Sequence, residues 1–243
     1  MSIETTSIRV WDAPVRVFHW LLVLCFAGAY LSAESERWQL VHITLGYTMA
    51  GLIAFRVLWG LVGTRYARFA QFVRGPGAVM GYLQSLRSRA PEHHLGHNPA
   101  GAWAIVLILL AGGALTFSGW ANYNEIGGNW IEELHEVLGN GMLLLVGVHV
   151  AGVVVSSRLH RENLVRAMFT GRKPGAPSQG IARSYGWLAA ILLAVVLGFW
   201  VNQWRNAPTP ENAAASVPTA PTAVATVPSW PTMEHRNHAR TVG

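Results

Sequence analysis

The 243-residue chain is 51% hydrophobic and only 12% charged, whereas charged residues make up about 25% of an average soluble domain. This composition excludes an ordinary soluble domain and predicts a membrane protein. The net charge of +6 comes mainly from arginines beside apolar stretches, which favours contact with anionic membrane lipid over nucleic-acid binding. The single cysteine, Cys25, excludes an intrachain disulfide.

Five apolar runs follow one another, over residues 18–33, 40–62, 102–120, 134–157 and 185–204. Most approach the ~20 residues that a helix needs to cross ~30 Å of hydrocarbon. The first run also resembles a cleaved signal peptide, but its leader mixes Glu4 and Asp12 with arginines, whereas a signal has a clearly basic leader. We therefore expect an all-α membrane protein, a four-helix transmembrane bundle with an additional C-terminal transmembrane helix.

The segments between the runs predict how the chain is oriented. Residues 63–101 and 158–184 are rich in arginine and poor in acidic residues, whereas the other short loops are acidic. The positive-inside rule places the two basic segments in the cytoplasm, so that the N-terminus is cytoplasmic and the C-terminus lies outside. Within the first basic segment, we expect a short interfacial helix over residues 80–87.

Four histidines lie inside or at the ends of the apolar runs: His19, His42, His135 and His149. His135 and His149 are 14 residues apart on one predicted helix, a rise of about 21 Å that returns to within about 40° of the same face. In the predicted topology, His42 and His135 share an outer level, and His19 and His149 share an inner level. Ionisable side chains at membrane depth are costly, so these positions indicate a function.

Two opposed imidazoles at each level favour iron in a planar macrocycle over zinc or copper, whose sites gather three or four protein ligands. The pattern predicts two haem b groups, one between His19 and His149 and one between His42 and His135. For any single histidine, structural hydrogen bonding is the alternative. Gly46 and Gly139 each follow a histidine by four residues, and they either make room for the macrocycle or allow close helix packing.

Two arginines are candidates for binding haem propionates. Arg56 lies 14 residues after His42 and so reaches the inner level, and Arg16 lies about one turn before His19. Arg56 either binds a propionate or extends to the cytoplasmic surface, and Arg16 either does the same or marks the membrane boundary.

Histidines outside the apolar runs give weaker signals. His93, His94 and His97 have no cysteine partner, and we interpret them as solvated loop residues rather than as a metal site. Residues 206–243 are rich in Pro, Ala, Thr and Val, which predicts a disordered outer tail. His235 and His238 near its end are interpreted in the same way as the loop histidines.

The sequence resembles the prokaryotic cytochrome b561 family, which includes the b-type cytochrome subunits of nickel-iron hydrogenases. The resemblance rests on VWDAPVRVFHW at 10–20, HITLGYTMAGLIAFRVLWGLVG at 42–63, the basic loop that follows, and HEVLGNGMLLLVGVH at 135–149. It covers about residues 8–173 and implies a di-haem core in a bacterial cytoplasmic membrane, with His19, His42, His135 and His149 as axial ligands. We expect a core over 1–173, the additional transmembrane helix within 174–205 and the tail over 206–243.

The resemblance also implies a function, the transfer of electrons between a quinone pool and a soluble or peripheral redox partner such as a hydrogenase or a c-type cytochrome. This describes an electron-transfer subunit rather than a stand-alone enzyme. Two alternatives stay open, namely a self-contained quinone or superoxide oxidoreductase and a non-redox membrane anchor or assembly protein. The additional helix and tail would bind a particular partner or anchor the chain in a larger complex.

Overall fold

The computed structural model describes residues 6–86, 88 and 92–207. Its internal contacts divide the chain after Asn206. Apart from residues 206 and 207, the predicted outer tail therefore lies outside the described residues, and His235 and His238 lie there with it.

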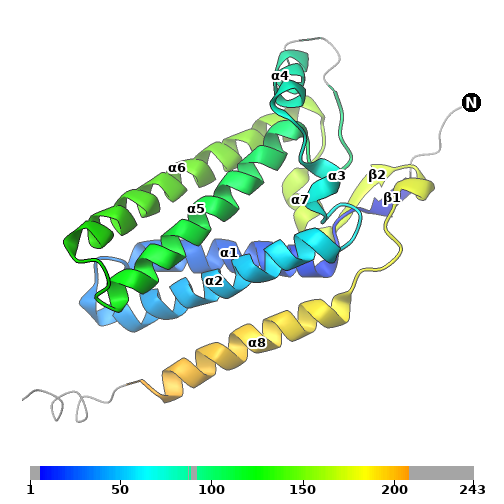
Figure 1. The fold of residues 1–243 in the computed structure, drawn as a ribbon. Coiled ribbons are helices and arrows are strands. Elements are labelled where there is room, and N and C mark those ends of the chain that lie inside the picture. Colours follow the sequence, from blue (N-terminus) through cyan, green and yellow to red (C-terminus); the bar gives the residue numbers. More distant parts are fainter. Residues whose placement is uncertain (1–5, 87, 89–91, 208–243) are drawn as a thin grey trace, which may run out of the picture. The chain divides into compact units, whose positions relative to one another are not determined.

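Five helices are long and apolar enough to cross a membrane, which confirms an all-α membrane protein with a fifth, C-terminal candidate span. They are α1 (Ala13–Ser32), α2 (Gln39–Val62), α5 (Pro99–Tyr123), α6 (Asn129–Leu159) and α8 (Gly186–Arg205), drawn in Figure 1. A short 3₁₀ helix, η1 (Glu36–Trp38), leads from α1 into α2.

Capping residues explain why two of these helices begin before their apolar runs. The Asp12 side chain accepts a hydrogen bond of 2.8 Å from Val15 N, and Pro14 stands in the first turn of α1. The Asn98 side chain accepts from Gly101 N at 2.7 Å, next to Pro99 at the start of α5. A polar cap followed by proline satisfies free N–H groups and sets the helical φ, so each helix extends beyond its hydrophobic part.

The remaining elements lie between the long helices. They are α3 (Phe69–Phe72), α4 (Pro76–Ser85), α7 (Leu164–Thr170), the 3₁₀ helix η2 (Pro177–Gln179), β1 (Thr6–Arg9) and β2 (Arg172–Gly175). Helix α4 confirms the short helix expected near residues 80–87, although it starts earlier because Pro76 suits a first turn. Arg87 lies outside the described residues.

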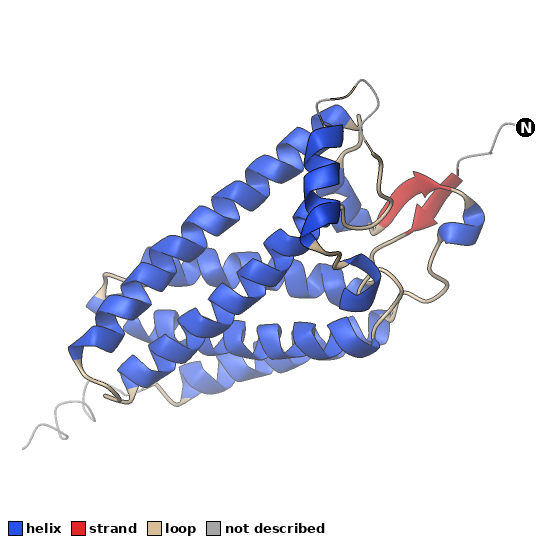
Figure 2. Ribbon diagram, turned by 45° about the horizontal axis from the view of Figure 1, so that its top comes forward, coloured by secondary structure: helices blue, strands red, loops and turns tan. Residues whose placement is uncertain are grey.

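Strands β1 and β2 were not expected from the sequence. The two strands pair antiparallel, with Thr6 opposite Gly175 and Arg9 opposite Arg172, as Figure 2 shows in red. Each strand has only four residues, too few to show an alternating pattern. Their pairing is decided by contact across more than 160 residues of sequence.

The long helices pack mainly as two neighbouring pairs. Helix α1 packs along α2, α5 packs along α6, and α2 with α5 joins the pairs, while α8 packs on α1 and α2 (Figure 1). Among the described residues, α6 has no comparable backbone packing with α1 or α2. The backbone of α6 is therefore not closely packed on α1 and α2, and the side chains of α6 on that side face the space between these helices.

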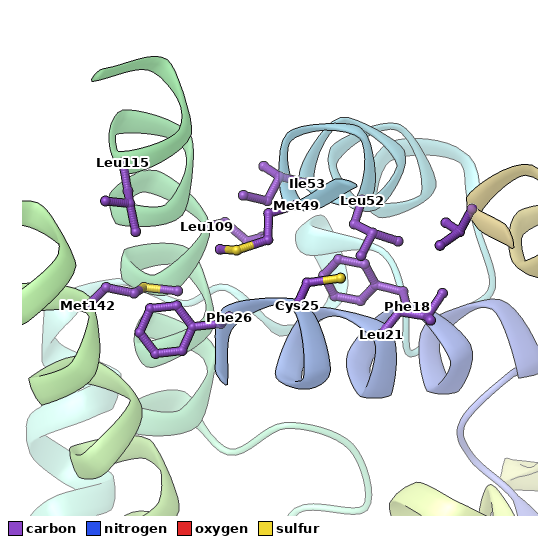
Figure 3. Packing of buried hydrophobic residues seen from close by; sticks show 11 residues of the cluster. Phe18, Leu21, Cys25, Phe26, Met49, Leu52, Ile53, Leu109, Leu115 and Met142 are labelled. Atoms are coloured by element: carbon purple, nitrogen blue, oxygen red, sulfur yellow. The ribbon is translucent and has the colours of Figure 1, made fainter. Parts of the chain in front are cut away.

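An apolar layer crosses the middle of the bundle. Its buried residues come from α1, α2, α5, α6 and α8, and Figure 3 shows them close together. Phe26, Met49 and Met142 belong to this layer, and each lies seven residues from one of the four histidines. Seven residues rise about 10 Å and stay near the same helix face. The layer therefore separates the two histidine levels.

Asp12 connects the segments at one end of the bundle. Its carboxylate accepts hydrogen bonds from Trp59 Nε1 at 3.0 Å and Thr64 Oγ1 at 2.6 Å. Ala13 N donates to Ser184 O at 2.8 Å, just before α8. The basic loops lie at the same end of the bundle as Asp12, which predicts that this end faces the cytoplasm. It is called the inner end, and the opposite end is called the outer end.

Candidate cofactor-binding site

His42 and His135 face each other at the outer end. Their ring centroids are 6.1 Å apart and their planes are inclined by 80°. Two imidazoles bound to one metal ion through nitrogens about 2 Å from it have centroids roughly 6 Å apart. The structure thus brings together the two histidines that were paired by depth, at a separation that suits a shared metal.

Backbone carbonyls orient both outer rings. His42 Nδ1 lies 2.8 Å from Ala29 O in α1, and His135 Nδ1 lies 3.1 Å from Leu115 O in α5. Because a carbonyl only accepts, each Nδ1 carries the proton and each Nε2 keeps its lone pair. This second hydrogen bond is typical of histidines that bind a metal.

Glycines leave open space beside these rings. Within the described residues, a Cβ added at Gly46 would meet no atom within 4 Å, and one at Gly139 would meet only Leu115, at 3.9 Å. Neither glycine is therefore needed for close helix packing, so the alternative that they make room for a flat macrocycle is favoured. Gly119 differs, because a Cβ there would lie 2.7 Å from His135 Cε1, and this glycine lets the ring rest against α5.

His19 and His149 lie at the inner end, on α1 and α6. They are close enough to interact electrostatically, although no hydrogen bond joins either ring to a described residue. His19 Nδ1 is buried without a partner, and the His19 ring stands edge-on to Trp20 with centroids 5.0 Å apart. The inner rings are thus less firmly oriented by the protein than the outer ones.

Both candidate arginines lie near this inner pair. Arg56 is only 3% exposed, and its guanidinium lies over the Phe69 ring, 4.8 Å from the centroid. Among the described residues, its Nη1 and the Nε of Arg16 are buried without a hydrogen-bond partner, while Arg16 Nη1 donates to Phe169 O. The Asp12 carboxylate interacts with both guanidiniums electrostatically, but no ion pair joins them among the described residues, so the free N–H groups suit an anionic group that has two oxygens.

His97 corrects the interpretation of the loop histidines. Its ring packs between Trp11 and Phe72, with centroids 4.5 Å and 4.6 Å away, and its Nδ1 is buried with no hydrogen-bond partner in the described part of the chain. Burial and the nearby Arg56 lower the pKa of His97 to about 3, with His149, Lys173 and His19 adding to the effect. The His97 ring is therefore packed against other side chains near the inner pair and is not a solvated loop residue.

Sequence reasoning missed His97 because helical spacing does not apply to a loop residue. One usable signal was its position two residues before Pro99, at the level of the inner pair. His93, in contrast, is half exposed and lies 3.4 Å from Glu162. No group of three His, Cys, Asp or Glu side chains in the described part of the chain could hold a metal ion.

These residues fit haem better than a bare ion. A bare ion needs three or four protein ligands, whereas iron in a porphyrin needs only two. At the outer end, the paired rings and the space beside Gly46 would suit the iron and the plane of one haem. At the inner end, the free Nη1 of Arg56 would suit a propionate of the other.

Comparisons with known proteins point to the same class. Residues 10–171 match the family described as prokaryotic cytochrome b561. A probable Ni/Fe-hydrogenase 1 B-type cytochrome subunit of Escherichia coli (strain K12) is 28% identical over 149 residues, which cover 51% of this chain and 63% of the relative. The chain thus spans less than two thirds of that relative's length. No solved structure matches the chain.

Two further relatives are covered more fully. They are probable Ni/Fe-hydrogenase B-type cytochrome subunits of Rhizobium leguminosarum bv. viciae and Rhodobacter capsulatus, each 24% identical. The first match covers 71% of this chain and 91% of the relative, and the second covers 69% and 82%. Since the family match spans more than half of the sequence and includes all four histidines, the chain belongs to the prokaryotic cytochrome b561 family.

Proposed function

We propose that this protein carries electrons within a bacterial cytoplasmic membrane by means of two haem b groups, one between His42 and His135 and one between His19 and His149. The observation that carries this proposal is the 6.1 Å separation of the His42 and His135 rings, each held through Nδ1. Haem iron with two imidazole ligands supplies one-electron transfer and keeps no open position for oxygen.

The protein's own contribution is to hold and insulate the two sites. The carbonyls of Ala29 and Leu115 orient the outer rings, and Arg56 and Arg16 provide positive charge for propionates at the inner end. The layer of Phe26, Met49 and Met142 excludes water between the levels. Along α6 the two histidines are about 21 Å apart, so the sites span most of the hydrocarbon.

A groove between α2 and α8 supports the link to a quinone. It is an open groove of about 540 Å³, lined mostly by apolar side chains, and its volume lies within the range of small-molecule sites. Tyr47 and Gln203 also line it, and neither side chain hydrogen-bonds to another described residue. Their O–H and N–H groups suit the carbonyl oxygens of a quinone, and Tyr47 lies about 8 Å along α2 from His42.

For the partner, we propose a peripheral redox protein of the hydrogenase type, with a c-type cytochrome as the other candidate. The names of the relatives support the first, since each is a probable subunit of a Ni/Fe-hydrogenase. The predicted topology, with a cytoplasmic N-terminus and a periplasmic C-terminal tail, exposes the outer site to a partner outside the cytoplasm.

The test is a reduced-minus-oxidised visible spectrum of the purified chain, combined with histidine substitutions. We expect a b-type signal from two haems per chain. His42→Ala and His135→Ala should each remove one and the same haem, and His19→Ala and His149→Ala should each remove the other. His93→Ala, in the exposed loop, is the control and should keep both.

Each other result has a defined meaning. Folded protein without a b-type signal, despite adequate haem supply, would refute the proposal and favour a membrane anchor. If His19→Ala and His135→Ala emptied the same site, the pairing would be wrong. Steady-state quinone or superoxide turnover by the isolated chain would instead indicate a self-contained oxidoreductase.

A further inference from the structure

Buried nitrogens without a partner gather at the inner site. Within the described residues they include Arg16 Nε, His19 Nδ1, Trp20 Nε1, Arg56 Nη1 and His97 Nδ1. A buried donor that has no acceptor is strongly destabilising, because it has lost its hydrogen bond to water. Five such atoms from α1, α2 and the loop before α5 indicate a bound group that carries acceptor oxygens.

His97 enters this group from a loop that the protein holds in a fixed position. Lys173 Nζ, on β2, donates to Leu95 O at 3.0 Å and lies 2.9 Å from Glu162 Oε2. Asn98 directly caps α5. Leu95, which lies two residues before His97, and Asn98, which directly follows it, are thus held in place. The Trp11 and Phe72 rings hold the imidazole itself.

We propose that His97 is a carboxylate-binding residue of the inner site, with its Nδ1–H donating to a haem propionate that Arg56 also binds. The inference rests on the haem assignment made above. A neutral imidazole has one N–H to give, and Nδ1 is the nitrogen of His97 that is buried without an acceptor. A hydrogen bond to a charged acceptor is stronger than one between neutral groups, so the contact would affect the reduction potential of this haem.

The test is a spectroelectrochemical titration of both haems in His97→Phe and His97→Gln. Phenylalanine keeps the ring between Trp11 and Phe72 but removes the donor, whereas glutamine keeps a donor. Loss of the His97 hydrogen bond leaves more negative charge on the propionate, which favours ferric iron. His97→Phe should therefore change the ferric/ferrous equilibrium constant of the inner haem by about tenfold, which lowers its one-electron reduction potential by about 59 mV. His97→Gln should shift it less, and His93→Gln, from the same loop, should not shift it.

A second arm separates hydrogen bonding from packing. The apoprotein is reconstituted with the dimethyl ester of the same iron porphyrin, which has no carboxylate. The difference in potential between wild type and His97→Phe should then disappear, whereas a packing effect would persist. The inner haem is identified as the one that His149→Ala lacks.

Several outcomes would overturn the inference. These are an unchanged potential of the inner haem in His97→Phe, a shift that persists with the ester, or an equal shift of the outer haem. Loss of the inner haem from both His97 variants would also overturn it, because that loss would indicate an axial or structural role. Failure of the haem assignment is distinct, because it would appear as wild-type protein without two haems.

Discussion

Asp12 provides the sharpest test of how the bundle is held together at its inner end. The side chain is only 1% exposed. It caps α1 through Val15 N and accepts from Trp59 and Thr64 at the end of α2. Losing a cap costs about 1 kcal/mol, and each hydrogen bond to a charged acceptor contributes about 1.5 kcal/mol or more. We therefore expect Asp12→Ala to lower the free energy of unfolding by about 4 kcal/mol.

The matched control is Asn98→Ala, which removes a helix cap and no cross-helix bond, and should cost only about 1 kcal/mol. Asp12→Asn retains the cap but turns an N–H group toward the Trp59 and Thr64 donors. Its loss in free energy of unfolding should therefore lie between those of Asn98→Ala and Asp12→Ala. The assay is reversible unfolding in mixed micelles, followed by far-UV circular dichroism. If Asp12→Ala lost no more stability than Asn98→Ala, the assigned role of the Trp59 and Thr64 bonds would be refuted.

Two further predictions use glycines with matched controls. Gly119→Val should remove only the outer haem from the visible spectrum, because its Cβ would lie 2.7 Å from His135 Cε1. The control, Gly113→Val, should keep both haems, because an added Cβ there meets no described atom within 4 Å. Equal visible spectra of the two variants would contradict this reasoning. Gly51→Leu should fill the α2–α8 groove and slow electron exchange with a soluble quinone analogue at unchanged haem content. Gly198→Leu, on α8 but outside the groove lining, should leave the rate unchanged, and a normal rate in Gly51→Leu would exclude the groove as the quinone site.

The spans were predictable because their cause is local. An α-helix satisfies its own backbone hydrogen bonds, so an apolar run long enough to cross the hydrocarbon has one stable conformation there. The helix starts could also have been found, since Asp12 and Asn98 each precede a proline near the first turn. The meeting of His42 with His135 followed from helical rise and the alternation of inside and outside.

The rest of the inner site depended on distant segments. Strand β2 pairs with β1, Lys173 fastens the loop at Leu95, and only then does His97 lie between Trp11 and Phe72. No periodic pattern marks such contacts, because loop residues have no fixed rise or rotation. The burial of Arg56 was equally undetermined, since a long side chain at that depth can reach water or stay within the bundle.

The sequence by itself determined the membrane class and the number of candidate spans, and it predicted the depth of each histidine, since hydropathy and helix geometry act over neighbouring residues. Only the tertiary structure decided which carbonyls orient the outer rings, that Arg56 Nη1 is buried without a hydrogen-bond partner among the described residues and that a loop histidine packs near the inner pair. Those features arise from contacts between segments far apart in the chain, and only the packed bundle specifies them.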